Sequence, residues 1–234
     1  MNFLTLPFLH AIIVKIEKGC NNMAKAILFD LDGTLTDSGE GILNCATVTL
    51  EYFGLPVPSR EEMRVFVGPP LRETFFKHGV PVDRLDEAVA VYRKRYIPIG
   101  MFENSPYDGI ENLLKELKTQ GHHLYVATSK PEWMAVEILT KFNLAPYFDI
   151  IAGATMDGVR DAKADVIAYL LEQTGNVTEA MMVGDTAFDV IGAAAHGIPT
   201  IGVSWGYGTV ESMVSAGAAG IAYTMDELFT LLNQ

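Results

Sequence analysis

Cysteine, basic residues and long hydrophobic runs are scarce in this 234-residue sequence. Cys20 and Cys45 are its two cysteines, which suggests neither a disulfide framework nor a zinc cluster and favours a reducing cytoplasm. Its 17 lysines and arginines face 29 acidic residues, so the formal net charge is −12. Because nucleic-acid backbones and anionic membranes are bound through broad basic surfaces, neither is an expected partner.

The apolar stretch over residues 3–14 is too short for a transmembrane helix, which needs about 20 residues. It has no basic segment before it and no small-residue cleavage site after it, which argues against a secretory signal. We expect residues 1–22 to be an N-terminal extension outside the fold and Met23 to be the natural start, because MAKAILFD opens directly into an apolar strand. Mass spectrometry of the natural protein should then detect no peptide from residues 1–22, and finding one would refute this start.

The sequence also lacks a P-loop, a GxGxxG string and a GxSxG string, and its five histidines follow no metal-ligand spacing. Its composition is 49% hydrophobic, which is enough to bury a substantial core. Because the net charge is −12, any anionic substrate must be bound locally, by a metal ion or by a few cationic side chains.

From Ser105 onward the sequence alternates between strand and helix patterns, which predicts an α/β fold with a doubly wound, Rossmann-like parallel sheet. The helix pattern is clearest over residues 110–117, where apolar residues recur at helical spacing. The expected strands of this part of the chain are residues 122–127, 148–152, 180–183 and 200–203.

Residues 39–104 interrupt this alternation and read as helices alone, with prolines between them. The expected helices are residues 41–53, 61–66, 71–78 and 85–97. We therefore expect a catalytic core made of residues 23–38 and 105–234, with residues 39–104 as a helical cap. Residues 37–40 and 102–109 would be the two hinges of this cap.

The most specific string is FDLDGTLTDS, residues 29–38, which follows the apolar strand of residues 26–29. Asp30 and Asp32 lie two apart and share one face, so both carboxylates can approach one phosphorus atom, one as nucleophile and one as acid/base. A bare pair of aspartates could equally be a solvated turn, but the longer DxDGTxTD string favours the functional interpretation.

Two further strings follow strands and precede helices. Thr128 begins the string TSKP, in which Pro131 is expected at the first helical position, where free backbone N–H groups favour a phosphate. Lys163 is expected at the start of another helix, where the dipole disfavours a cation unless an anion compensates it. Taken alone, the threonine could be a routine cap and the lysine a solvated surface residue.

The last string is MMVGDTAFD, residues 181–189, an apolar strand that ends in Asp185 with Asp189 four residues on. Carboxylates at neighbouring strand ends suit Mg²⁺, which prefers oxygen ligands. Asp189 alone fits a first-turn helix acid better than a direct ligand.

In this order, the four strings resemble motifs I to IV of the haloacid dehalogenase superfamily, and the resemblance extends over residues 23–234. The helical cap and the residues 205–208 resemble phosphoglycolate phosphatase-like and 5′-nucleotidase-like members with a C1-type cap. The sequence departs from many relatives in having Ala164 where they have proline after the lysine.

The resemblance implies a role for each motif residue. Asp30 would be the nucleophile and Asp32 the acid/base of an aspartyl-phosphate mechanism. Phosphate-binding residues would be Gly33, Thr128, Ser129 and Lys163. Magnesium would be held by Asp30, the backbone carbonyl of Asp32 and Asp185, with Asp189 as a supporting ligand. In the cap, Arg72 could pair with a second anionic group of the substrate or could simply be solvated.

The sequence therefore predicts a Mg²⁺-dependent phosphatase of a small phosphorylated metabolite, such as a phosphoglycolate-like acid, a sugar phosphate or a nucleotide. A phosphosugar mutase resembling β-phosphoglucomutase is the alternative, since it would use the same aspartyl-phosphate. The intact motif residues argue against a non-catalytic binding module, and Asp32 argues against a dehalogenase. A monomer or a homodimer is expected.

Overall fold

The computed structural model describes residues 24–175 and 179–234. The expected N-terminal extension, together with Cys20 and the proposed start at Met23, lies outside the described residues. Within the described ranges, no helix has both the length and the apolar character needed to cross a membrane.

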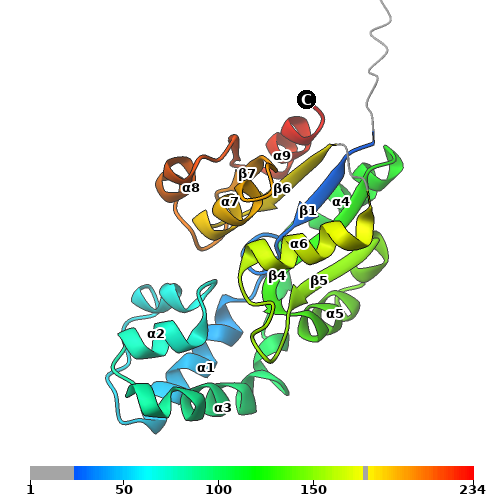
Figure 1. The fold of residues 1–234 in the computed structure, drawn as a ribbon. Helices are drawn as coiled ribbons and strands as arrows, with labels where there is room; N and C mark the ends of the chain where they lie inside the picture. Colours follow the sequence, from blue (N-terminus) through cyan, green and yellow to red (C-terminus); the bar gives the residue numbers. More distant parts are fainter. Residues whose placement is uncertain (1–23, 176–178) are drawn as a thin grey trace, which may run out of the picture.

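Six parallel strands form the central sheet, in the order β5-β4-β1-β6-β7-β8 (Figure 1). The strands are β1 Ala26–Phe29, β4 His123–Pro131, β5 Ile150–Ala154, β6 Ala180–Gly184, β7 Thr200–Val203 and β8 Gly220–Ala222. The predicted parallel α/β sheet is thereby confirmed, although β4 continues four residues past its predicted end. The three-residue β8 was missed, because so short a segment shows no periodicity.

Alternate residues of β1 face opposite sides of the sheet and enter two separate apolar clusters. Ile27 and Phe29 pack in the cluster that includes buried side chains of α4, α5 and α9, whereas Leu28 packs with α6 and α7. The helices of the sheet are α4 Ile110–Thr119, α5 Glu132–Lys141, α6 Lys163–Thr174, α7 Ala187–Ala194, α8 Val210–Ala216 and α9 Met225–Leu232. Helices on both faces bury the sheet, as expected for a doubly wound fold.

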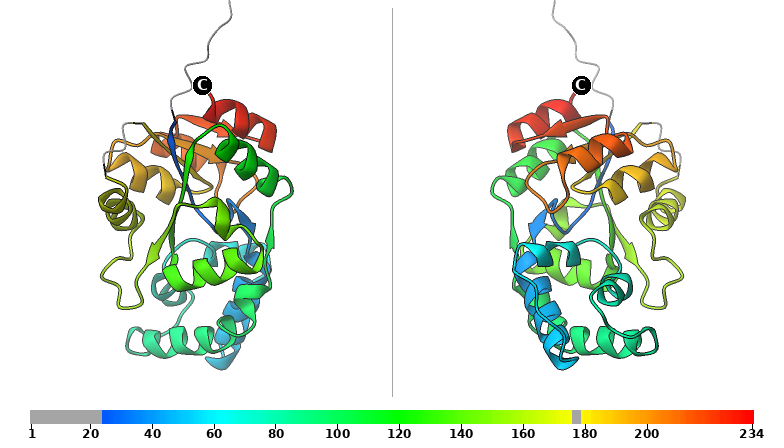
Figure 2. Two further views of the ribbon diagram at one scale, coloured as in Figure 1. Left: turned by 90° about the vertical axis from the view of Figure 1, so that its right-hand side faces the viewer. Right: turned by 90° about the vertical axis from the view of Figure 1, so that its left-hand side faces the viewer.

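A group of helices is inserted between β1 and β4, and we call it the helical insert. It contains α1 Gly39–Tyr52, η1 Glu62–Phe66, α2 Leu71–Lys77, η2 Val82–Arg84, α3 Leu85–Tyr96 and η3 Gly100–Phe102, the η elements being 3-10 helices. The predicted helical interruption is confirmed, although residues 62–66 form a 3-10 helix. Figures 1 and 2 show the insert beyond one end of the sheet.

Two short strands join the beginning and the end of the insert. β2 Thr36–Asp37 pairs antiparallel with β3 Ser105–Pro106, so both connections between the insert and the sheet run side by side. The cluster of buried residues that contains Phe29 continues into the insert through α1, α2 and α3. The insert therefore shares one apolar core with the sheet, and its two connections form a single narrow junction.

The close approach of α1 to η3 leads to a stability prediction. A Cβ atom at Gly41 would lie 1.8 Å from the carbonyl oxygen of Gly100. Replacing glycine by alanine inside a helix ordinarily stabilises it by about 1 kcal/mol, but Gly41→Ala should destabilise the protein by about 1–3 kcal/mol because the backbones must separate. Chemical denaturation measures this change. Val48→Ala, on the exposed side of α1, is the control and should change the stability by about 0.5 kcal/mol or less.

Candidate active site

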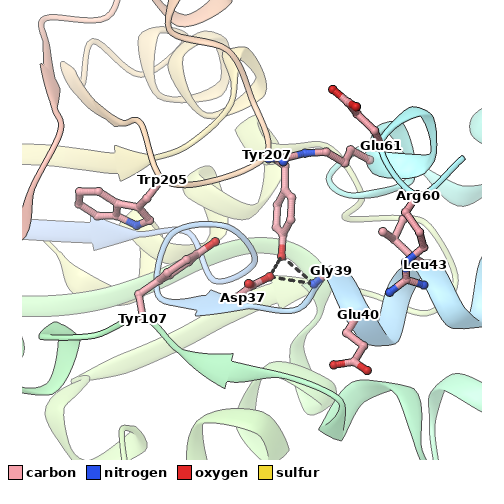
Figure 3. A pocket seen from close by; sticks show the side chains of 10 residues that line it. Asp37, Gly39, Glu40, Leu43, Arg60, Glu61, Tyr107, Trp205 and Tyr207 are labelled. Carbon is pink, nitrogen blue, oxygen red and sulfur yellow. Dashed lines mark hydrogen bonds between the residues drawn. The ribbon is translucent and has the colours of Figure 1, made fainter.

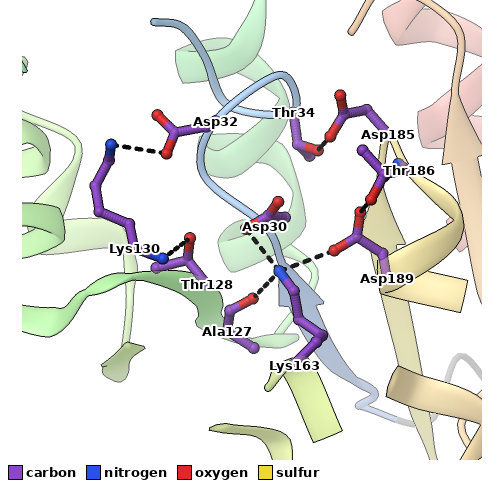
Figure 4. A network of polar contacts seen from close by, with 10 residues as sticks. All are labelled: Asp30, Asp32, Thr34, Ala127, Thr128, Lys130, Lys163, Asp185, Thr186 and Asp189. Atoms are coloured by element: carbon purple, nitrogen blue, oxygen red, sulfur yellow. Dashed lines mark hydrogen bonds and ion pairs between the residues drawn. The ribbon is translucent and has the colours of Figure 1, made fainter. Parts of the chain in front are cut away.

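The two aspartates of the first string lie at the carboxyl end of β1, a central strand of the sheet (Figure 4). The backbone N–H of Asp30 donates to the carbonyl of Val183 at 2.9 Å, which anchors Asp30 between β1 and β6. Leu31 between the aspartates is fully buried, and the chain then turns at Gly33 with φ of 82°. Both carboxylates therefore leave the sheet where parallel α/β folds bind ligands.

Lys163 pairs with the first of these aspartates. Its side chain is 5% exposed, and Nζ lies 2.8 Å from carboxylate oxygens of both Asp30 and Asp189. Nζ also donates to the carbonyl of Ala127 at 2.9 Å. Burial alone would lower the pKa of Lys163, but the charges of Asp189 and Asp30 raise it above its ordinary value. The predicted helix start at Lys163 is confirmed, since α6 begins there. The two carboxylates compensate the unfavourable interaction of the lysine with the helix dipole.

Lys130 pairs with the second aspartate. Its Nζ lies 2.8 Å from Oδ2 of Asp32, and the lysine side chain is 6% exposed. The sequence favoured Lys163 over Lys130 as the phosphate-binding lysine, and nothing near Lys130 in the chain indicated that it would be buried beside Asp32. Each aspartate of the string thus has a lysine of its own, Lys130 from the end of β4 and Lys163 from the start of α6.

Three carboxylates, those of Asp30, Asp185 and Asp189, place oxygen atoms within 4.8 Å of one another, and we call them the acidic cluster. Asp185 is fully buried and accepts hydrogen bonds from the Tyr207 N–H at 2.8 Å and the Thr34 hydroxyl at 3.3 Å. Burial, followed by the charges of Asp189 and Asp30, raises the pKa of Asp185 well above its usual range.

The same burial raises the pKa of Asp30 to about 6, against the opposing effect of Lys163. Lys163 contributes one positive charge near three carboxylates, so the acidic cluster retains a surplus of negative charge. Oxygen donors with a charge surplus fit a hard divalent cation such as Mg²⁺ or Ca²⁺. The residues present therefore fit the metal that the sequence predicts.

Asp189 uses both of its carboxylate oxygens within the protein. One oxygen accepts hydrogen bonds from the backbone N–H and the hydroxyl of Thr186, at 3.0 and 2.9 Å, and so caps α7. Its other oxygen pairs with Lys163. Asp189 is a first-turn helix acid in this structure, which leaves Asp30 and Asp185 better placed to bind a cation directly.

Glycines on two loops allow the backbone to approach Asp185 closely. A Cβ atom at Gly33 would lie 2.2 Å from Asp185 Oδ2, and one at Gly206 would lie 2.3 Å from the same atom. No larger residue can occupy either position without displacing the carboxylate or the loop. The glycine in the first string therefore shapes the acidic cluster.

Thr128 and Ser129 lie at the end of β4, beside the end of β1. Thr128 is buried, and its Oγ1 accepts a hydrogen bond from the Lys130 N–H at 3.2 Å. The predicted helix start was one residue too early, because Pro131 is the last residue of β4 and α5 begins at Glu132. Thr128 remains positioned where a phosphate-binding hydroxyl is expected.

Arg72 is placed differently from the other predicted residues. It lies on α2 with an exposed side chain, and its guanidinium pairs with Asp86 of α3. This contact lies wholly within the helical insert, so the structure gives Arg72 a surface ion pair. Its expected contact with a substrate anion stays a prediction.

Two other arginines of the insert line a cavity of about 560 Å³ between the insert and the loop after β7 (Figure 3). Arg64 donates to the carbonyl of Gly206 at 3.0 Å, and its guanidinium lies 5.6 Å from the centre of the Tyr207 ring. Aromatic and acidic residues complete the lining, which comprises Asp37, Gly39, Glu40, Leu43, Arg60, Glu61, Arg64, Tyr107, Trp205 and Tyr207.

Tyr207 connects this cavity with the acidic cluster. Its backbone N–H donates to Asp185, while its hydroxyl donates to Asp37 and accepts from the Gly39 N–H, where α1 begins. The sequence indicated a resemblance to family members at residues 205–208 but not these contacts, because they join segments far apart in the chain.

Comparisons with known proteins agree with this geometry. A family model described as haloacid dehalogenase-like hydrolase matches residues 27–203. The chain is 43% identical over 205 residues to the tyrosine-protein kinase PtkA of Mycobacterium tuberculosis, covering 86% of this chain and 70% of that protein. It is 41% identical over 189 residues to a 5′-nucleotidase of Pseudomonas aeruginosa, covering 80% of this chain and 86% of that protein. The crystal structure of a predicted phosphatase from Clostridium acetobutylicum superposes with a TM-score of 0.85 at 43% identity, covering 89% of this chain and 98% of that one.

Removing Lys163 tests the electrostatics of the site independently of any activity. Lys163→Met should destabilise the protein by about 3–5 kcal/mol at neutral pH, because Asp30 and Asp189 would lose their buried cation. Denaturant unfolding of the purified variant measures the change. Lys118→Met is the matched control, since Lys118 pairs with Asp149 in a partly exposed position. This variant should lower the free energy of unfolding by about 1 kcal/mol or less. Equal losses in the two variants would contradict the assigned role of Lys163.

Proposed function

The chain belongs to the haloacid dehalogenase-like hydrolases, and on that premise we propose that it is a Mg²⁺-dependent phosphatase of small phosphomonoesters. The observation that carries the proposal is the position of Asp30. It lies at the carboxyl end of a central strand, pairs with the buried Lys163 and shares the acidic cluster with Asp185. A carboxylate in these surroundings can act as a nucleophile towards phosphorus.

In the first step, an oxygen of Asp30 attacks the phosphorus atom as the bond to the ester oxygen breaks. The product is an aspartyl-phosphate, and Asp32 supplies a proton to the departing alkoxide. In the second step, Asp32 takes a proton from a water molecule that attacks the same phosphorus. The bond between phosphorus and the Asp30 oxygen breaks, which releases inorganic phosphate and restores the Asp30 carboxylate. The Thr128 hydroxyl and the Lys163 ammonium hold the phosphoryl oxygens, with Gly33 and Ser129 beside them.

Asp30 and Asp185 would hold Mg²⁺, with the backbone carbonyl of Asp32 as a further ligand and Asp189 in support. This assignment is supported by the charge surplus of the acidic cluster. When bound, the ion supplies positive charge that offsets the repulsion between the carboxylates and a phosphate dianion. Without it, the raised pKa values of Asp30 and Asp185 reflect buried carboxylates that repel one another.

The helical insert and the loop after β7 would select the leaving group. Their cavity adjoins the acidic cluster through Tyr207, which lines the cavity and hydrogen-bonds to Asp185, and it offers aromatic rings and two arginines to a ligand. Aromatic rings stack on nucleobases and on flat rings in general, whereas arginine pairs with carboxylates and phosphates. These features support nucleotides, phosphoglycolate-like acids and sugar phosphates as the substrates to test.

Phosphate release from a panel of these esters and from p-nitrophenyl phosphate tests the proposal, with Mg²⁺ or with EDTA. The wild type should release phosphate with Mg²⁺ and lose this activity with EDTA. Asp30→Asn should lower turnover by at least about 10⁴-fold, because the nucleophile is gone. Asp149→Asn is the control, since Asp149 lies in a partly exposed ion pair away from the acidic cluster, and it should retain wild-type turnover.

Release that survives EDTA, or full activity in Asp30→Asn, would refute the proposal. If no ester is hydrolysed, a sugar bisphosphate added to a sugar monophosphate distinguishes the mutase alternative. Phosphate transfer between the two sugars would then establish a mutase instead of a phosphatase.

A further inference from the structure

The lysine beside Asp32 has no part in the mechanism above. Lys130 is a buried cation at the end of β4, and burying a charge is unfavourable unless partners compensate for it. Its Nζ has two partners, Oδ2 of Asp32 at 2.8 Å and the hydroxyl of Tyr96 at 2.5 Å. Figure 4 shows Lys130 pointing to Asp32, whereas Lys163 points to Asp30 and Asp189.

An irregularity in β4 directs Lys130 to this position. The pairing of β4 with β5 changes register between Thr128 and Pro131, so two residues bulge from the ladder. The bulge is held by the hydrogen bond from the Lys130 N–H to the Thr128 hydroxyl. Across from it, a Cβ atom at Gly153 would lie 2.6 Å from the Lys130 carbonyl oxygen, so the bulge fits only against glycine. Bulges beside active sites commonly redirect a side chain in this way.

The ion pair leaves the two oxygens of Asp32 in different states. Oδ2 is held by Lys130, whereas Oδ1 is buried and has no hydrogen-bond partner within the described structure. A buried polar atom without a partner is unfavourable, so a group brought by the substrate would satisfy it. Holding one oxygen also fixes the orientation of the other, because the carboxylate is planar.

Lys130 also joins Asp32 to the helical insert. Tyr96 belongs to α3, is 3% exposed, and stacks on Tyr92 at 5.2 Å between ring centres. Lys130 lies 4.9 Å from the centre of the Tyr96 ring and donates to its hydroxyl. One ammonium group therefore contacts both the insert and the aspartate that would transfer the proton.

We propose that Lys130 is a positioning residue, which holds Asp32 through Oδ2 so that Oδ1 faces the ester oxygen while α3 is docked. This inference rests on the proposed function. As the bond between Asp30 and phosphorus forms, the ester P–O bond breaks, its electrons go to the leaving oxygen, and the proton on Asp32 Oδ1 passes to that oxygen. Lys130 keeps its own protons and does not contact the phosphoryl group.

The test uses esters that differ in their need for a proton. An alkoxide leaves poorly unless it is protonated, whereas p-nitrophenolate leaves as a stable anion. The ratio kcat/KM reports the steps through the loss of this first leaving group, so it is independent of the later hydrolysis. Lys130→Met should lower kcat/KM by about 10²-fold for the best alkyl phosphate of the panel. For p-nitrophenyl phosphate it should change kcat/KM less than about threefold, and KM for both esters should stay close to the wild-type values.

A uniform loss for both esters would overturn the proposal, because a structural defect does not distinguish leaving groups. A large rise in KM for both would also overturn it, since Lys130 would then bind the phosphoryl group. Lys141→Met, on an exposed lysine of α5, is the control and should leave both kcat/KM values unchanged.

Tyr96→Phe provides a second variant that removes only the hydroxyl acceptor. It should show the same preference for p-nitrophenyl phosphate, with a smaller loss on the alkyl ester. The double variant should lose no more than Lys130→Met alone, because both changes act through one contact. Additive losses would overturn the link to the insert. Wild-type hydrolysis of p-nitrophenyl phosphate that disappears in Asp30→Asn establishes the phosphatase first, so selectivity in the Lys130 variants then decides this inference alone.

Discussion

Mutual repulsion among buried carboxylates is the constraint on which the site depends. Asp30, Asp185 and Asp189 converge at the carboxyl ends of β1 and β6, where burial makes their negative charges unfavourable. Lys163 offsets part of this charge, and its place at the first position of α6 makes sense only because these anions are near. The buried carboxylates thus lower the stability of the fold, in an arrangement that a substrate and a cation would complete.

The same edge of the sheet also receives the helical insert. Tyr207 forms hydrogen bonds to the buried Asp185 through its N–H and to the start of α1 through its hydroxyl. Lys130 forms an ion pair with Asp32 and a hydrogen bond to Tyr96. Two carboxylates of the site are therefore tied to the insert by separate contacts. Since β2 and β3 join the insert to the sheet at one narrow junction, its position and the orientation of these carboxylates are physically linked.

Much of the architecture was predictable because its signals are local. Apolar runs identified five of the six strands of the central sheet, with errors of up to four residues at their ends, and the helical insert was recognised from its helical pattern and its prolines. The errors have physical causes. β4 extends to Pro131 because pairing with β5 resumes after a bulge, although Pro131 was expected at the first position of the following helix. Residues 205–208 lacked any local sign that Tyr207 would reach Asp185 and Asp37.

By itself, the sequence determined the fold class and the motif residues Asp30, Asp32, Thr128, Lys163 and Asp185. It could do so because strand periodicity and short motifs are properties of neighbouring residues. Only the tertiary structure decided which lysine pairs with which aspartate, and that Arg64 instead of Arg72 meets the loop after β7. Those contacts join residues up to 142 positions apart, and their energies depend on burial, which no local pattern encodes.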